Sequence, residues 1–167
     1  MRLTTLTDYA LRLLMHVAQQ PERLCTIAEV AQRYDISQAH LMKVTHRLAQ
    51  CGWIETVRGK GGGMRLARPA AEIALGAVVR DMESDFAIVE CFGPGTGCAL
   101  DGQCRLAGVL DAALQDFLRH LDGVSLQDIL PRRAAATAPI TLQRRPGAAA
   151  PPAGERHVRA RRTDRPR

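Results

Sequence analysis

In the N-terminal half of the chain, the spacing of apolar residues changes from the period of a helix to that of a strand. Helical spacing holds in three segments: one that Thr7 can cap and that ends near Gln19, one after Thr26, and one from Gln38 to about Gln50. Ser37 is placed to cap the third segment. Two short helices joined by a tight polar turn at residues 34–36 predict a helix-turn-helix.

The strand period follows at once. Residues 53–57 alternate between apolar and polar side chains, and residues 64–67 can return antiparallel to them. Residues 58–63, between the two runs, are Arg-Gly-Lys-Gly-Gly-Gly, which is typical of a hairpin loop. A further helix is expected around Leu75–Met82. The order predicts a mainly α fold with a small β-hairpin wing, which is a winged helix-turn-helix over residues 1–83.

In a winged helix-turn-helix, the second helix of the pair enters the major groove of DNA. A glutamine there can read adenine, and a lysine suits a phosphate. Arg58 and Lys60 would bring the wing to the DNA backbone, with glycines allowing close approach. The residues expected to contact DNA from the second helix are Ser37, Gln38, His40, Leu41, Lys43 and Arg47.

Three of the five cysteines lie within one short glycine-rich stretch, at Cys91, Cys98 and Cys104. Three thiolates on such a loop suit a thiophilic metal or an iron–sulfur cluster. Zinc is disfavoured because the stretch lacks the close cysteine pair of structural zinc sites, and the spacing does not name a fourth ligand. Cys25 and Cys51 are expected to be small buried side chains.

The longest predicted helix runs from about Cys104 to Leu121. Its apolar residues keep the 3–4 spacing throughout, at positions 106, 109, 110, 113, 114, 117, 118 and 121. The stripe is wide for a helix at the end of a small domain, which favours dimerisation. Residues 84–130 are therefore expected to form a metal-binding loop and a dimerisation helix.

Charge and composition exclude several classes of protein. The net charge of +6 comes from residues 131–167, which hold ten Arg and two acidic residues and are expected to be a disordered tail. No apolar run approaches the roughly 18 residues of a membrane span, so a cytoplasmic protein without membrane contact is expected. The chain lacks a catalytic triad, paired catalytic carboxylates and a nucleotide-binding fingerprint, so it is not expected to be an enzyme.

Three stretches together carry a family resemblance: residues 1–12, residues 57–66 at the wing, and the three-cysteine loop that leads into a long helix. They resemble the NsrR-type nitric-oxide-sensitive repressors, in the winged-helix family that also contains IscR. The resemblance covers about residues 1–130 and leaves the tail outside.

The resemblance implies a homodimeric repressor of double-stranded operator DNA, with one cluster per subunit held by Cys91, Cys98 and Cys104. It also implies that Asp8 of the partner subunit is the fourth ligand of a 4Fe–4S cluster, oriented or neutralised by Arg12. Ala107 stands where IscR-like members carry a histidine ligand, which argues against their type of 2Fe–2S site. The gap of six residues between the first two cysteines is longer than in many members, so a 2Fe–2S cluster stays open.

The signal that such a regulator would sense has three possible interpretations. The signal can be nitric oxide, which would break the Asp8 tether and so change the spacing of the two recognition helices. It can instead be iron supply, sensed as cluster occupancy. A regulator that depends on thiol oxidation or on zinc is the third reading.

Overall fold

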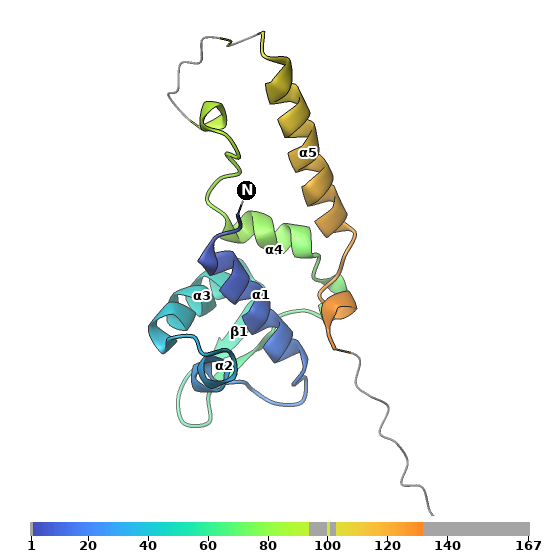
Figure 1. The fold of residues 1–167 in the computed structure, drawn as a ribbon. Helices are drawn as coiled ribbons and strands as arrows, with labels where there is room; N and C mark the ends of the chain where they lie inside the picture. The colour runs from blue at the N-terminus through green and yellow to red at the C-terminus, as the bar shows by residue number, and fades with distance from the viewer. Residues whose placement is uncertain (1, 94–99, 101–102, 132–167) are drawn as a thin grey trace, which may run out of the picture. The chain divides into compact units, whose positions relative to one another are not determined.

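The structure is a computed structural model that describes residues 2–93, 100 and 103–131 (Figure 1). Cys98 and residues 132–167 of the expected tail lie outside this part, so the predictions made for them are not tested. In chain order, the elements of the described part are α1 (Thr5–Ala18), α2 (Ile27–Tyr34), α3 (Gln38–Gln50), β1 (Ile54–Val57), β2 (Gly63–Leu66), η1 (Ala70–Glu72), α4 (Leu75–Met82), η2 (Glu90–Phe92), α5 (Arg105–Asp122) and η3 (Gln127–Ile129). The predicted fold class, mainly helical with one antiparallel hairpin, is confirmed.

Side-chain caps set where α2 and α3 begin. Thr26 caps α2 in a full capping box, in which the Thr26 hydroxyl accepts from the Glu29 N–H at 3.2 Å. The Ser37 hydroxyl caps α3 by accepting from the His40 N–H at 3.3 Å. Each such cap stabilises its helix by about 1 kcal/mol. Both predicted starts are confirmed.

The predicted start of α1 is wrong. Its cap is Thr4, whose hydroxyl accepts from the Thr7 N–H at 3.3 Å, and Thr7 itself is fully buried inside the first turn. The Thr4 N–H donates to Glu83 Oε1 at 2.8 Å, across a long stretch of sequence. This tertiary contact stabilises Thr4 in the capping position, which local sequence alone could not reveal.

The turn between α2 and α3 depends on Asp35. Its φ of 53° places it in the left-handed region, the only such non-glycine residue in the described part. Aspartate tolerates this conformation better than most residues do. The Ile36 N–H donates to the Ala31 carbonyl at 3.1 Å, and the Ile36 side chain is buried. The chain therefore turns within the three residues that separate α2 from α3.

The main core lies among α1, α2, α3 and the hairpin. The expected inward stripe of α3 is confirmed, because Leu41, Val44 and Leu48 are at most 1% exposed. β1 and β2 pair antiparallel with Ile54 opposite Leu66, and the hairpin adds Ile54 and Met64 to the core. The other fully buried large side chains of this core include Leu13, Leu14, Val30, Ile73 and Leu126.

Figure 1 shows α4 lying between α1 and α5, and it contacts both. Val79 of α4 packs in a second small core with Leu114 and Leu118 of α5. Arg80 binds both carboxylate oxygens of Asp122, at 2.5 and 2.8 Å. After α5 the chain returns to the main core, where the buried Leu126 donates its N–H to the Ile73 carbonyl at 2.8 Å.

Residues 1–132 form one compact unit, and the predicted division of roles near residue 83 stays a prediction. Within the described residues, no helix combines the length and the apolar character that a membrane crossing requires.

Candidate nucleic-acid interface and metal centre

The N-terminal half of α3 presents a polar face to solvent. Gln38, His40 and Lys43 are exposed, as sequence reasoning expected of residues that meet DNA. The His40 ring lies 6.2 Å from the Tyr9 ring of α1, which limits the directions it can take. Ser37 is exposed too, but its hydroxyl is engaged in the helix cap. This face offers hydrogen-bonding groups near the helix N-terminus, where an anion is favoured, and a cation one turn further along α3.

Leu41 is not part of this face. Its side chain is 0% exposed and belongs to the main core, so it cannot contact DNA. The helical stripe that predicted Leu41, Val44 and Leu48 to face inward was the correct indication for this residue. Placement at the start of a recognition helix does not override that period, because only one face of a packed helix reaches solvent.

Arg47 has a structural partner. Its Nε and terminal nitrogen donate to the backbone carbonyl of Asp81 at 3.1 and 2.9 Å. Asp81 lies in the last turn of α4, where backbone carbonyls lack helical partners. Arg47 therefore connects α3 to α4, and its guanidinium is not free to reach DNA in this conformation.

Asp81 is a residue that sequence reasoning missed. Its carboxylate accepts a hydrogen bond of 2.8 Å from the indole N–H of Trp53, which is 6% exposed. The guanidinium of Arg68 lies over the Trp53 ring, 4.8 Å from its centre. Trp53 immediately precedes β1, so Asp81 holds both the recognition helix and the wing against α4. A buried tryptophan that needs an acceptor was the only sequence signal, and it does not identify the partner.

The wing carries two exposed cations, Arg58 and Lys60. Neither makes an ion pair within the part of the chain that the structure describes. The loop needs glycine at Gly59 and Gly61, whose φ values are 100° and 78°. A Cβ on Gly62 would lie 2.3 Å from the Val57 carbonyl oxygen, so a side chain there is excluded as well. Both cations stand free on a tightly shaped turn.

Two of the three cysteines of the predicted cluster site are described. Cys91 is exposed in the short turn η2, and Cys104 is half-buried at the N-cap of α5. Both are free thiols. The first turn of α5 holds no acidic residue, and within the described residues no side chain caps its start. Backbone N–H groups at such a helix start carry partial positive charge, which favours an anionic group.

A cavity of about 760 Å³ is lined by residues near both cysteines in sequence, although neither cysteine lines it. Its walls are mostly apolar and come from the segment before the cysteine loop and from the start of α5. They include Phe86, Phe92, Ala107 and Gly108. Residues 94–99 and 101–102, with Cys98 among them, lie outside the described part.

Asp8 lies at the start of α1, on the wall of a different cavity of about 470 Å³. Arg12 binds both of its carboxylate oxygens, at 3.1 and 3.0 Å, with both side chains about half exposed. The predicted pairing of Arg12 with Asp8 is therefore present. Among the described residues of one chain, Asp8, Cys91 and Cys104 are not gathered into a ligand group.

Residues 3–132 match the family model Rrf2, described as an iron-dependent transcriptional regulator. The chain is 48% identical over 132 residues to the HTH-type transcriptional regulator NsrR of Halalkalibacterium halodurans, covering 78% of this chain and 90% of that protein. It is 46% identical over 132 residues to the protein of the same name from Bacillus subtilis, covering 78% of this chain and 90% of that protein.

The fold is similar to that of a solved regulator. The structure of CymR, the global cysteine regulator of B. subtilis, superposes with a TM-score of 0.63 at 22% identity, over 77% of this chain and 95% of that one. At this identity the likeness concerns the fold alone.

The role of Asp81 can be tested by substitution. We expect Asp81→Ala to lower the free energy of unfolding by about 1–3 kcal/mol, because it leaves the buried Trp53 N–H without its acceptor. Asp81→Asn is the control, since the amide oxygen can still accept from the indole. Urea denaturation monitored by Trp53 fluorescence measures both variants. Equal losses in the two would show that the hydrogen bond is not what stabilises the contact.

Proposed function

The chain belongs to the Rrf2 family of transcriptional regulators, and from this premise we propose that it is a homodimeric repressor whose operator affinity is controlled by an iron–sulfur cluster that reacts with nitric oxide. The observation that carries the proposal is its 48% identity, over nearly the whole of the relative, to a regulator named NsrR. Two free cysteines, Cys91 in η2 and Cys104 at the N-cap of α5, and an exposed polar face on α3 support it.

DNA binding is assigned to the exposed part of α3 and to the wing. All five side chains concerned are exposed. We assign Gln38 and His40 to base edges, and we assign phosphate contacts to Lys43, Arg58 and Lys60. The hydroxyl of Ser37 is used in the cap, so its contribution is the N-terminus of α3 that it orients. Arg47 holds α3 through its hydrogen bonds to Asp81, and Leu41 holds it by packing in the main core.

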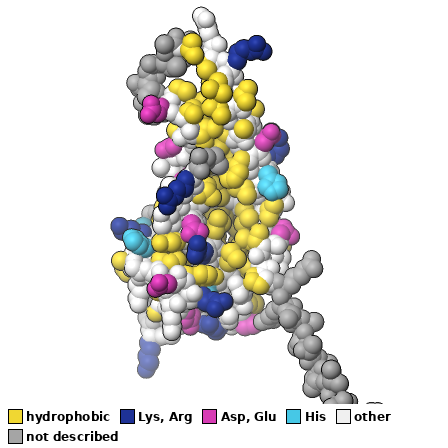
Figure 2. Space-filling view, in the orientation of Figure 1, with side chains coloured by type: hydrophobic (Ala, Val, Ile, Leu, Met, Phe, Trp, Pro, Cys, Tyr) yellow, Lys and Arg dark blue, Asp and Glu magenta, His cyan; other side chains and the backbone are white. Residues whose placement is uncertain are grey.

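Dimerisation is assigned to α5. Its side facing α4 is packed, yet Leu106 and Val109 are 62% and 64% exposed, one turn apart on the same face. Figure 2 shows hydrophobic side chains gathered where α5 lies. We assign this face to a second copy of the chain, because a winged helix that reads two half-sites needs two-fold symmetry. The recognition helices of such a dimer must lie roughly 34–36 Å apart.

The cysteine of η2 and the cysteine at the N-cap of α5 have the chemistry that an iron–sulfur cluster requires. Cys91 and Cys104 offer free sulfur ligands, and α5 presents uncapped N–H groups of the kind that stabilise a negatively charged group. The resemblance adds Cys98 and the partner subunit's Asp8 as further ligands and favours a 4Fe–4S cluster over 2Fe–2S. When bound, such a cluster supplies iron that reacts with nitric oxide.

The protein's own part in the response depends on Asp8 and Arg12. As a ligand in the other subunit, Asp8 would tie the start of α1 to the partner's α5. Within its own helix, the Asp8 carboxylate is bound by Arg12. Because α1 packs against α3, a change in how α1 is held changes the position of the recognition helix.

A second candidate function is the sensing of iron supply. The family description as iron-dependent regulators favours it. In this case, loss of the cluster under iron limitation would release DNA without nitric oxide. If an iron chelator releases the DNA while nitric oxide has little effect on DNA binding, this candidate is supported over the first.

The DNA-binding face can be tested with a duplex selected from random sequences by the purified protein. We expect Lys43→Ala to weaken binding to selected and scrambled duplexes alike and to lower the salt slope of log K by about 1. Gln38→Ala should instead lower the preference for the selected duplex, by about 1–3 kcal/mol. Arg119→Ala, on α5, is the control for a lost surface cation. Unchanged preference in Gln38→Ala would contradict its role in base reading.

The dimer can be tested at Val109, which is the more exposed of the two apolar residues on this face of α5. We expect Val109→Glu to shift the protein toward monomer in sedimentation velocity and to weaken operator binding at least tenfold, because charge on an apolar interface opposes its burial. Gln115→Glu places the same charge on another exposed position of α5. A Val109→Glu protein that stays dimeric would contradict the assignment.

The cluster mechanism can be tested by anaerobic purification. We expect broad visible absorption that bleaches when nitric oxide releases the DNA, and no such absorption in Cys104→Ser. We expect Asp8→Ala to change operator affinity or nitric oxide sensitivity by about 10–100-fold, with Asp116→Ala as the control.

Two outcomes would overturn parts of this mechanism. A protein that stays colourless after anaerobic reconstitution yet binds DNA would remove the cluster. Unchanged affinity and unchanged response in Asp8→Ala would remove the tether.

A further inference from the structure

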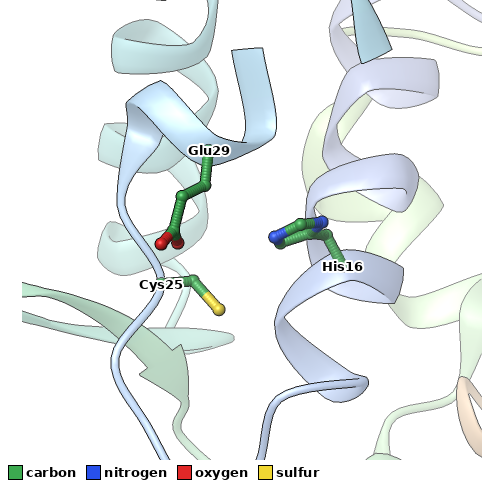
Figure 3. Close-up of side chains that lie close together, drawn as sticks. All are labelled: His16, Cys25 and Glu29. Carbon is green, nitrogen blue, oxygen red and sulfur yellow. The ribbon is translucent and has the colours of Figure 1, made fainter. Parts of the chain in front are cut away.

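Three potential metal ligands converge inside the winged helix, away from the cysteines assigned to the cluster. His16 comes from α1, Cys25 from the segment before α2, and Glu29 from the first turn of α2. Figure 3 shows the three side chains lying close together, with the imidazole directed toward the side of Glu29 and Cys25. The ligand atoms all lie within 4.8 Å of one another. Sequence spacing did not indicate this group, because Cys25 alone is typical of a small buried side chain.

The imidazole of His16 combines a lowered pKa with a buried nitrogen that has no partner in the described part of the chain. Its Nε2 atom is buried and has no hydrogen-bond partner within the described residues. Burial lowers the pKa of His16, which favours the neutral ring. A neutral imidazole with a free nitrogen is the form that binds metals. A buried nitrogen without a partner costs folding free energy, and a metal ion bound at Nε2 would remove that cost.

The other two ligands are fixed by the fold. Cys25 is fully buried, and its backbone pairs in both directions with Met64 of β2, at 2.9 and 2.8 Å. Glu29 is held by the N–H of Thr26 at 3.0 Å and by Arg23 at 3.0 and 3.1 Å. Its side chain is 39% exposed, so the carboxylate is the side of the group from which an ion can enter.

We propose that His16, Cys25 and Glu29 form a second metal site, which binds a divalent cation of the zinc class through nitrogen, sulfur and oxygen. This donor set suits zinc, whose ligand atoms in tetrahedral sites lie roughly 3.3–3.8 Å apart. The three atoms therefore need to close by about 1 Å, which side-chain rotations can supply. On binding, the Cys25 thiol loses its proton to solvent and the thiolate bonds to the metal. Water completes the fourth position.

A metal here joins three parts of the DNA-binding half. His16 anchors α1, Glu29 anchors α2, and Cys25 is paired with the strand that leads out of the wing. The bound ion stabilises the folded winged helix in proportion to its affinity. The site shares no residue with the proposed cluster site, so the two can be tested independently.

The experiment uses the full chain with Cys91, Cys98 and Cys104 replaced by serine, which leaves only Cys25 and Cys51 as thiols. Cobalt(II) is titrated anaerobically as the probe, followed by displacement with zinc. We expect one equivalent of cobalt and a thiolate-to-cobalt charge-transfer band. Zinc should also raise the melting temperature of this protein.

Single substitutions in that background identify the ligands. Cys25→Ser should abolish the charge-transfer band, while Cys51→Ser, the matched control, should keep it. Glu29→Gln retains the capping interaction with Thr26 and should weaken cobalt binding at least tenfold. His16→Gln should weaken it further.

The result that overturns the site is a parent protein that shows no thiolate band, or a band that survives Cys25→Ser. Far-ultraviolet circular dichroism without metal checks that each variant is folded. If Cys25→Ser does not fold, unchanged cobalt affinity in Glu29→Gln and His16→Gln overturns the site equally.

Discussion

The burial of one face of α3 is the constraint on which the rest of the structure depends. Leu41, Val44 and Leu48 point into the core between α1, α2 and the hairpin, and they are at most 1% exposed. This leaves Gln38, at the helix end where an anion is favoured, and Lys43, in the second turn, exposed to solvent. A one-residue rotation of α3 would bury those polar groups and expose the apolar ones, so the hydrophobic effect determines which residues can read DNA.

The position of α3 is also set by its hydrogen bonds to α4. Asp81 accepts from Arg47 through its carbonyl and from Trp53 through its carboxylate, which connects the recognition helix and the wing to one residue. α4 in turn is bound to α5 by the Arg80–Asp122 pair and by a small apolar core. The C-terminal half of α5, packed at Leu114 and Leu118, is thus connected through α4 to the proposed DNA-binding face. This continuity gives a change at α5 a physical route to α3.

Local sequence patterns predicted the elements well. The α3 boundaries, the capping of α2 and α3, the hairpin and α4 all follow from short-range chemistry, namely apolar spacing, a polar cap and glycines that permit a tight loop. The start of α1 was misplaced by three residues, because Thr4 is held as the cap by Glu83 from a distant part of the chain. The family resemblance rested on contiguous motifs of the same kind, and the comparison with known relatives bears it out.

Contacts between distant segments were decided only by the tertiary structure. Sequence periodicity shows that a side chain is buried but not what it touches, so the Arg47–Asp81–Trp53 contact was not foreseeable. The convergence of His16, Cys25 and Glu29 has the same origin, since α1, the β-bridge at Cys25 and α2 meet only in the packed fold. What the chain encodes locally is which segments become helices, strands and loops. Which polar groups then share a site depends on how those segments pack, because packing is set by the sum of many contacts rather than by any one residue.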